Sequence, residues 1–263
     1  MPLLRALEMP AASPTNDSRK LQFDRDGFLV VRNFLSPDEL SKLASELDRY
    51  IRDVVPTLPA SAAFFEDPTR LETLKQLQHM GVDPFFDAYR ANAKWTGLAA
   101  ELIGEPSAAQ APEWFNKPPG TNHPTPPHQD NFYFCLKPPN VATLWLALDP
   151  VDEENGCLRY GPGSHRMGIR DHNPTKVLGF SQGICDYAAE DESRECAITL
   201  APGDLVAHHG ETIHRADPNR SATRQRRAFA MVFRGESVER DDAAYSRYEA
   251  SLKQQHSQLG LEA

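Results

Sequence analysis

The stretch PPHQDNFYF, residues 126–134, contains the only His-x-Asp triplet of the sequence. If it lies on a strand or just enters one, His128 and Asp130 point to one face and Gln129 points to the other. An imidazole and a carboxylate on one face of a barrel strand are suited to hold a metal ion together. Because one such triplet also arises by chance, a metal site needs a third ligand from elsewhere in the chain.

The third ligand is expected in PGDLVAHHGETIHRADPNR, residues 202–220, which contains His208, His209 and His214. A single histidine on a strand is usually a packed or solvent-facing residue. Here three histidines within seven residues follow a Pro-Gly-Asp turn and an apolar run, which makes a metal ligand among them more plausible. Two histidines and one carboxylate form a facial triad, which leaves three positions open on octahedral iron and is typical of non-haem Fe(II) oxygenases. Zinc sites more often use four nitrogen or sulfur ligands.

An arginine cluster in RSATRQRRAFAMVF, residues 220–233, runs directly into an apolar strand. An arginine buried at the head of a core strand needs an anion, and its planar fork suits a carboxylate. A keto acid that chelates iron at one end and meets this arginine at the other would use both features. Strand alternation favours Arg226 for the inward position, with Arg227 as the alternative. Arg220 and Arg224 are expected in a solvated turn.

Composition limits the class of protein. The 263 residues, 40% hydrophobic and 25% charged, suffice for one large domain with a full core. The net charge of −9 argues against a nucleic-acid partner. No apolar run approaches the roughly 20 residues of a membrane span, and the first twenty residues lack the pattern of a secretory signal. Four cysteines without CxxC spacing fit a reduced protein, so we expect a cytoplasmic protein that acts on a small molecule.

Helical patterns dominate the first part of the chain after a strand at 27–35. Ser36 is a predicted N-cap, Pro37 takes the first helical position, and Glu39 completes a capping box. Further helices are predicted at 69–80 and 87–103, the latter ending at Gly104. Four residues at helical spacing predict the buried stripe of the first helix: Leu40, Leu43, Leu47 and Ile51. A loop at 54–68 is long enough to be a lid, although a surface connection explains it equally well.

After Gly104, prolines and glycines separate short runs rich in β-forming residues, such as NFYFCL, VATLWLAL, CAITL and RAFAMVF. Asn155-Gly156 predicts a hairpin turn between two of these runs. The pattern indicates a mainly β fold, a sandwich or barrel, with flanking helices. We expect one domain at 21–236, with a helical flank at 36–104 and a β-rich core at 110–236. Residues 1–20 are predicted as a mobile tail and 237–263 as a peripheral helix and tail.

The motifs NKPPG…PPHQDNFYF, VATLWLALDPVDEENGCLRYGPGSH and PGDLVAHHGETIHRADPNRS…RRA occur in an order that resembles the phytanoyl-CoA dioxygenase family of Fe(II)- and 2-oxoglutarate-dependent oxygenases. The resemblance covers most of residues 22–236. It implies a double-stranded β-helix, the cupin-like jelly roll, flanked by helices. It also implies that His128, Asp130 and His214 hold Fe(2+) and that Arg226 binds the far carboxylate of 2-oxoglutarate.

The same resemblance assigns further residues. Tyr133, Trp145 and Lys117 match positions that line the family's co-substrate pocket, although aromatic residues in β-runs are also ordinary core residues. His209 matches a family histidine that is not a ligand. The implied reaction consumes O2 and 2-oxoglutarate, hydroxylates an unactivated C–H bond, and releases succinate and CO2. Asp130 argues against the related halogenases, which lack this carboxylate.

The substrate is suggested only by the loop GPGSHRMGIRDHNPTK, residues 161–176, because loops on a rigid β-scaffold often contact substrates. The candidates there are Arg166, Arg170, His172 and Lys176, and Gln129 is a further candidate beside the metal. If this loop is not simply solvated, the substrate carries an anion. A small polar metabolite is favoured over an acyl-CoA, since the chain is acidic and lacks a large basic patch.

Two other classes of protein stay open. A cupin-like, metal-dependent isomerase would bind the metal but not 2-oxoglutarate, and would leave Arg226 unexplained. A non-catalytic binding protein on the same scaffold would usually lack one residue of the triad.

Overall fold

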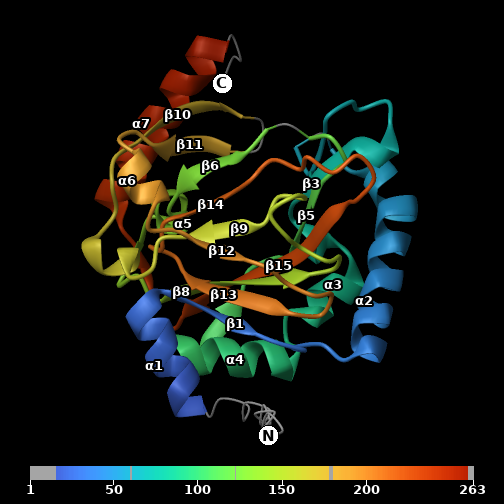
Figure 1. Cartoon of the computed structure of the whole chain (residues 1–263), viewed down its shortest axis with the longest axis horizontal. Helices are drawn as coiled ribbons and strands as arrows, with labels where there is room; N and C mark the ends of the chain where they lie inside the picture. The colour runs from blue at the N-terminus through green and yellow to red at the C-terminus, as the bar shows by residue number, and fades with distance from the viewer. Residues whose placement is uncertain (1–15, 60, 122, 178–179, 260–263) are drawn as a thin grey trace, which may run out of the picture.

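The computed structural model describes residues 16–59, 61–121, 123–177 and 180–259 (Figure 1). Within these ranges the larger of two packed antiparallel sheets has the strand order β1-β13-β8-β15-β5-β3-β2, with β4 beside β15. Its strands are β1 (Phe28–Val31), β2 (Ala63–Phe65), β3 (Leu74–Leu77), β4 (Ser107–Ala109), β5 (Glu113–Lys117), β8 (Val141–Ala147), β13 (Leu205–His209) and β15 (Arg226–Gly235).

The smaller sheet has the order β12-β9-β14-β6 among the described strands, and the β10-β11 pair lies beside β6. A further pair, β7-β16, stands apart. The bounds are β6 (Thr125–His128), β7 (Leu136–Lys137), β9 (Leu158–Tyr160), β10 (His172–Val177), β11 (Phe180–Ile184), β12 (Cys196–Ile198), β14 (His214–Ala216) and β16 (Glu239–Arg240). Apolar side chains of both sheets share one core, so the predicted jelly roll with flanking helices is confirmed.

Side chains of the central strands alternate between two cores. Leu144 of β8 and Phe229 of β15 belong to the core between the larger sheet and the helices. Trp145 and Ala230, one residue further along, belong to the core between the two sheets. Alanine at position 230 fills little volume, and this side of the sheet borders a cavity.

Helices cover the outer face of the larger sheet (Figure 1). The described helices are α1 (Asn16–Asp26), α2 (Pro37–Arg49), α3 (Pro84–Tyr89), α4 (Ala93–Ile103), α5 (Asp130–Phe134), α6 (Ala189–Glu192) and α7 (Asp242–Leu259). Short 3-10 turns occur at Val55–Thr57, Leu71–Thr73, Met80–Val82 and Ser164–Met167, and a π-helical turn at Tyr50–Val54. No helix in the described ranges is both long and apolar enough to span a membrane.

Helix α2 begins as the sequence predicts. The Ser36 hydroxyl accepts from the Glu39 backbone N–H at 3.3 Å, and the Glu39 carboxylate accepts from the Ser36 N–H at 2.8 Å. Leu43 and Leu47 are buried in the helix-side core. Gly104 ends α4 with φ +88°, a conformation that favours glycine.

Phe229 tests how strongly the helices hold the sheet. Its fully buried ring lies 5.7 Å from the rings of Tyr89 and Trp95, centroid to centroid. We expect Phe229→Ala to lower the free energy of unfolding by about 3–5 kcal/mol, because the cavity left among these rings cannot collapse fully. Urea unfolding measures the loss, with the exposed Leu21→Ala as control. A loss below about 1 kcal/mol would show that this contact is not central to the fold.

Two predicted helices differ from the structure. Within 69–80, residues Leu74–Leu77 form strand β3, which pairs with β5 and β2. The sequence there is rich in helix formers, but pairing with the sheet buries Gln76 and Leu77, and this overrides local propensity. The stretch 87–103 is divided because Asn92 caps a new helix, its side chain accepting from the Lys94 N–H.

The predicted loop at 54–68 contains strand β2, which forms an edge of the larger sheet. The run NFYFCL is mostly helix α5 and not a strand, and the Asn131 side chain fixes its end by binding the backbone N–H and C=O of Leu136. Asn155-Gly156 lies in a turn but not in a hairpin, because β8 before it and β9 after it belong to different sheets.

The chain ends also differ in part from the prediction. Residues 16–20, expected in a mobile tail, form the start of α1, and Phe23 of this helix is buried in the helix-side core. The rest of the predicted tail, residues 1–15, lies outside the described residues. Helix α7 lies beside α5 and β10, with the Tyr248 ring 6.1 Å from the Phe132 ring, and residues 260–263 lie outside the described residues.

Candidate metal centre

Strand pairing brings His128 and His214 together. His128 ends β6, His214 begins β14, and the two residues are direct partners in the β6-β14 ladder. Cross-strand partners hold their side chains close together on one face, and the two imidazole centroids are 4.2 Å apart. Residues 86 positions apart in the sequence therefore present two nitrogen ligands side by side.

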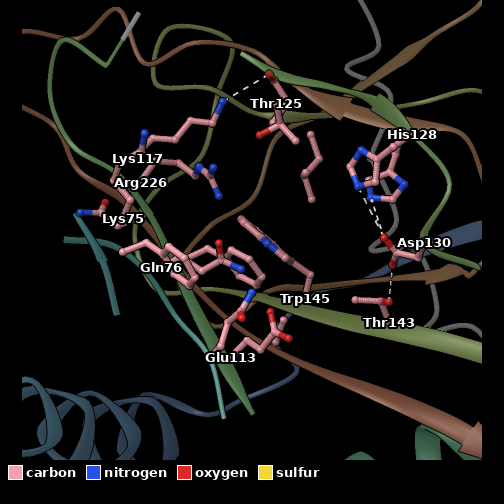
Figure 2. A pocket seen from close by; sticks show the side chains of 18 of the residues that line it. Lys75, Gln76, Glu113, Lys117, Thr125, His128, Asp130, Thr143, Trp145 and Arg226 are labelled. Carbon is pink, nitrogen blue, oxygen red and sulfur yellow. Dashed lines mark hydrogen bonds and ion pairs between the residues drawn. The ribbon is translucent and has the colours of Figure 1, made fainter. Parts of the chain in front are cut away.

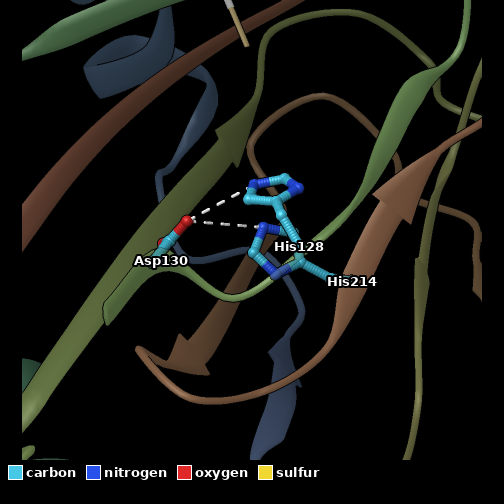
Figure 3. Close-up of side chains that lie close together, drawn as sticks. All are labelled: His128, Asp130 and His214. Atoms are coloured by element: carbon cyan, nitrogen blue, oxygen red, sulfur yellow. Dashed lines mark ion pairs between the residues drawn. The ribbon is translucent and has the colours of Figure 1, made fainter. Parts of the chain in front are cut away.

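Asp130 joins them from the first position of α5. Its Oδ1 lies 3.5 Å from His128 Nε2 and 3.7 Å from His214 Nε2 (Figure 3). The ligand atoms of the three residues all lie within 4.8 Å of one another. Gln129 between them is extended and turned away, as predicted, and its amide donates to the carbonyls of Gly168 and Glu211.

The protonation of these groups suits a metal ion. The Nδ1 atom of each histidine lies on a backbone carbonyl, 2.8 Å for His128 and 3.0 Å for His214, so Nδ1 carries the proton and Nε2 is left to face the ligand cluster. Burial lowers the pKa of His214 well below its usual value. Burial would raise the pKa of Asp130, but the imidazoles of His214, His128 and His208 outweigh it and hold that pKa well below its usual range. A neutral imidazole and an ionised carboxylate are the forms that bind metals.

Two residues hold the Asp130 carboxylate: Thr143, which sequence reasoning missed, and His208, which it considered only as a possible metal ligand. Thr143 donates its hydroxyl to Oδ2 at 2.7 Å, and His208 Nε2 lies 3.1 Å from the same oxygen. Tyr160 in turn places its hydroxyl 2.9 Å from His208 Nδ1. Oδ2 is thus occupied and Oδ1 faces the histidines, an arrangement for a monodentate carboxylate ligand. The sequence feature that could have indicated this role of Thr143 is a polar residue within the apolar run VATLWLAL, two residues from Trp145.

Replacing Thr143 tests this support. Thr143→Val keeps the side-chain shape but removes the hydrogen bond to Oδ2, so we expect the affinity for Fe(II) to fall about 10–100-fold. Anaerobic equilibrium dialysis measures the affinity, and the exposed Thr223→Val is the matched control. An unchanged affinity in Thr143→Val would mean that the hydroxyl does not orient the ligand.

The triad faces a cavity of about 290 Å³, and Arg226 and Lys117 lie at its opposite end (Figure 2). Arg226 is buried, and its Nε has no hydrogen-bond partner among the described residues. Burial lowers the pKa of Arg226 to about 10. Its guanidinium lies 5.3 Å from the centroid of the Trp145 ring. Lys117, its cross-strand partner, donates to the Asp217 carbonyl at 2.6 Å, and burial lowers the pKa of this lysine well below its usual value.

The other arginines of the cluster serve the surface. Arg227 is exposed and forms an ion pair with Asp149 at 2.7 Å, as expected for the outward position on a strand. Arg224 pairs with Asp152 at 2.7 Å and Arg220 is exposed, so both lie in the predicted solvated turn.

Tyr133 lines the cavity, whereas His209 does not. The Tyr133 ring lines the cavity 6.0 Å from the His128 ring, while its hydroxyl donates to the Gln182 carbonyl at 2.6 Å. His209 does not line the cavity; it packs against Phe23 and His165, with ring centroids 6.2 and 5.2 Å away.

The described residues of the loop predicted to contact a substrate do not line this cavity, and other protein groups hold several of its polar atoms. Arg170 forms ion pairs with Asp186 at 2.7 Å and Asp191 at 3.0 Å. His172 stacks on Phe132 at 4.1 Å and accepts from the Gln129 N–H. The side-chain oxygen of Gln129 accepts from the Arg170 N–H. Arg166 is exposed, and the Lys176 side chain lies outside the described residues.

A jelly roll that holds two histidines and one carboxylate at a cavity between its sheets defines the class of non-haem iron oxygenases. The donor set fits iron, and the buried guanidinium of Arg226, whose Nε has no hydrogen-bond partner within the described ranges, fits a carboxylate co-substrate. The family model "Phytanoyl-CoA dioxygenase (PhyH)" matches residues 23–228, and the chain belongs to this family. It is therefore a non-haem Fe(II)- and 2-oxoglutarate-dependent dioxygenase, and the isomerase and binding-protein alternatives are set aside.

Curated relatives extend over most of the chain. The chain is 28% identical over 250 residues to phytanoyl-CoA dioxygenase 1 of Oryza sativa subsp. japonica, covering 81% of this chain and 87% of that protein. It is 25% identical over 244 residues to the phytanoyl-CoA dioxygenase of Arabidopsis thaliana, covering 80% and 85%.

Solved structures share the fold. EvdO2 from Micromonospora carbonacea var. aurantiaca, complexed with 2-oxoglutarate, has a TM-score of 0.67 at 24% identity and covers 86% of this chain and 93% of its own. EctD from S. alaskensis, with 2-oxoglutarate and 5-hydroxyectoine, has a TM-score of 0.69 at 19% identity, covering 88% and 79%. SnoN, an epimerase of nogalamycin biosynthesis in complex with Fe3+, alpha ketoglutarate and nogalamycin RO, has a TM-score of 0.68 at 20% identity, covering 85% and 84%.

Proposed function

We propose that this protein hydroxylates an unactivated C–H bond of a small polar molecule bound in the cavity. His128, Asp130 and His214 would hold the iron. When bound, Fe(II) and 2-oxoglutarate supply the oxidising power from O2, with release of succinate and CO2. The protein contributes binding, orientation and the exclusion of water.

One observation carries this proposal: the buried Arg226 guanidinium, whose Nε has no partner in the part of the chain that the structure describes, lines the same cavity as a complete facial triad. Removing a charge from water without a partner is costly, so such a group indicates an anionic ligand. We assign the far carboxylate of 2-oxoglutarate to Arg226, whose cross-strand partner Lys117 lines the same end of the cavity. The ion pair of Arg227 with Asp149 supports this choice of arginine.

The remaining cavity residues would orient these groups. Thr143 and His208 hold the Asp130 carboxylate, so its Oδ1 is fixed toward the histidines. The Trp145 ring packs against the Arg226 guanidinium and limits its movement. Aromatic and aliphatic side chains that line the cavity would exclude water from the reacting C–H bond: Phe64, Phe115, Phe134, Leu158 and Val232.

The size and lining of the cavity support a small substrate. About 290 Å³ suits a metabolite, and EctD with 5-hydroxyectoine is an example of a structurally similar protein that holds one. The phytanoyl-CoA dioxygenases among the relatives make an acyl-CoA the alternative. Arg170, the candidate in the loop for binding an anionic substrate, is already paired with Asp186 and Asp191. The loop therefore does not favour an anionic substrate.

Isotope labelling tests the reaction. Under ¹⁸O2 the iron-loaded protein should convert 2-oxoglutarate to succinate that carries one labelled oxygen atom, slowly without a substrate and faster with one. The second labelled atom should appear in the hydroxylated product, which mass spectrometry detects. Succinate without label, or no succinate from iron-loaded folded protein, would contradict the proposal.

A further inference from the structure

A carboxyl group on the cavity wall has no role in the chemistry derived above. Glu113 begins β5 and lies on the same strand face as Phe115 and Lys117, so its side chain points into the cavity (Figure 2). Its cross-strand partner on β15 is Ala230, whose methyl group is too short to cover the carboxyl. Gln76 of the adjacent strand β3 lies beside it on the same wall.

No cation forms an ion pair with Glu113 in the part of the chain that the structure describes. Of the cations that line the cavity, Lys75 pairs with Glu66 at 3.0 Å and Lys117 donates to backbone carbonyls. Burial raises the pKa of Glu113 to about 7; the Gln76 side chain opposes this shift and the Asp130 charge adds to it. A carboxylate that lines a cavity and has no cationic partner among the described residues is costly to desolvate, so its presence on this wall indicates a ligand.

The charge balance of the site also favours a substrate that is not an anion. If iron and 2-oxoglutarate bind as in the proposed function, on which this inference rests, the formal charges of Fe(II), Asp130, 2-oxoglutarate and Arg226 cancel. The rest of the cavity wall then contains Glu113, Lys75, whose charge is paired with Glu66, and uncharged amide and aromatic groups, among them Gln76, Gln78 and Phe115. A wall of this kind repels anions and accepts hydrogen bonds.

We propose that Glu113 and Gln76 form the substrate-recognition wall, and that they bind a hydroxyl or ammonium group of a neutral or cationic substrate. The apolar part of that substrate would lie against Phe115 and Phe134, which line the same cavity. A buried acceptor selects for the donor it binds, because an analogue without the donor leaves the acceptor unpaired. The wall therefore selects against carboxylates and phosphates, including the headgroup of an acyl-CoA.

Three probes on one skeleton test this selection: cyclohexylmethylamine, cyclohexylmethanol and cyclohexanecarboxylate. Each is titrated calorimetrically into the anaerobic Fe(II)/2-oxoglutarate complex at about pH 8, above the pKa of Glu113. We expect the amine and the alcohol to bind at least about tenfold more tightly than the carboxylate. Glu113→Leu should abolish this preference, and Gln76→Leu should reduce it. Glu113→Gln should keep the alcohol but weaken the amine.

The control is Glu192→Leu, which removes an exposed carboxylate outside the cavity and should bind all three probes as the wild type does. Three results would overturn the proposed role of Glu113 and Gln76. The carboxylate could bind as tightly as the amine and the alcohol or more tightly, or the preference could survive in Glu113→Leu. The third is that no probe binds to wild-type protein that holds 2-oxoglutarate. Failure of the wild type to bind 2-oxoglutarate, measured in the same samples, would instead overturn the proposed function.

Discussion

The variant Arg226→Met should lose its affinity for 2-oxoglutarate and yet fold at least as stably as the wild type. Loss of the partner of a buried carboxylate costs about 2–5 kcal/mol, so we expect binding to weaken about 30-fold or more. Without the co-substrate the Arg226 Nε has no partner among the described residues. A methionine of similar length leaves no such unpaired group and is expected to leave the stability unchanged or to raise it by about 1 kcal/mol.

Two measurements separate these effects. Anaerobic calorimetric titration of the Fe(II)-loaded protein gives the affinity for 2-oxoglutarate, and urea unfolding of the metal-free protein gives the stability. Arg227→Met is the matched control, since this neighbouring arginine is exposed and paired with Asp149, and it should bind 2-oxoglutarate normally. Equal losses of affinity in the two variants, or severe destabilisation by Arg226→Met alone, would mean that Arg226 has a structural role.

The variant Asp130→Ala should lose iron and turnover together. Asp130 is the only carboxylate of the ligand cluster found among the described residues, and its charge lies against the imidazoles of His128, His208 and His214. Removing a ligand should cost more than the roughly 100-fold that loss of a supporting hydrogen bond costs. We therefore expect no stoichiometric Fe(II) in the isolated protein and no labelled succinate.

Metal analysis and the succinate assay check this result. Asp186→Ala, which removes an exposed carboxylate far from the ligands in the sequence, should keep both iron and turnover. If Asp130→Ala still binds one Fe(II) with near-normal affinity, the carboxylate ligand has been assigned wrongly. Retained secondary structure in the circular dichroism spectrum would show that the loss is local.

The metal ligands could be predicted because short-range patterns mark them. His128 and Asp130 share a triplet, and the apolar strand segment after a turn marks a group of three histidines, from which the family resemblance selects His214. Strand alternation places Arg226 and Arg227 on opposite faces, and the family motif favours Arg226 for the inward one. The capping box of Ser36 and Glu39 fixed the start of α2 in the same local manner.

The residues whose roles sequence reasoning missed reach the site through pairing between distant segments. Thr143 and His208 lie opposite each other on β8 and β13, and only this pairing brings both to the Asp130 carboxylate. Gln76 lies in a stretch with helical propensity that the sheet recruits as β3. Glu113 lies on the same face of β5 as Lys117, but the sequence does not show that this face lines a cavity. Long-range pairing of this kind leaves no local periodicity in one sequence.

Binding of 2-oxoglutarate to iron in this cavity is tested most directly by an anaerobic titration of the Fe(II)-loaded wild-type protein with 2-oxoglutarate, monitored by visible spectroscopy. If the triad and Arg226 form the proposed site, a saturable iron-to-keto-acid charge-transfer band should appear at one equivalent of 2-oxoglutarate. Absence of the band in folded, iron-bound protein would contradict a 2-oxoglutarate-dependent oxygenase built on His128, Asp130 and His214.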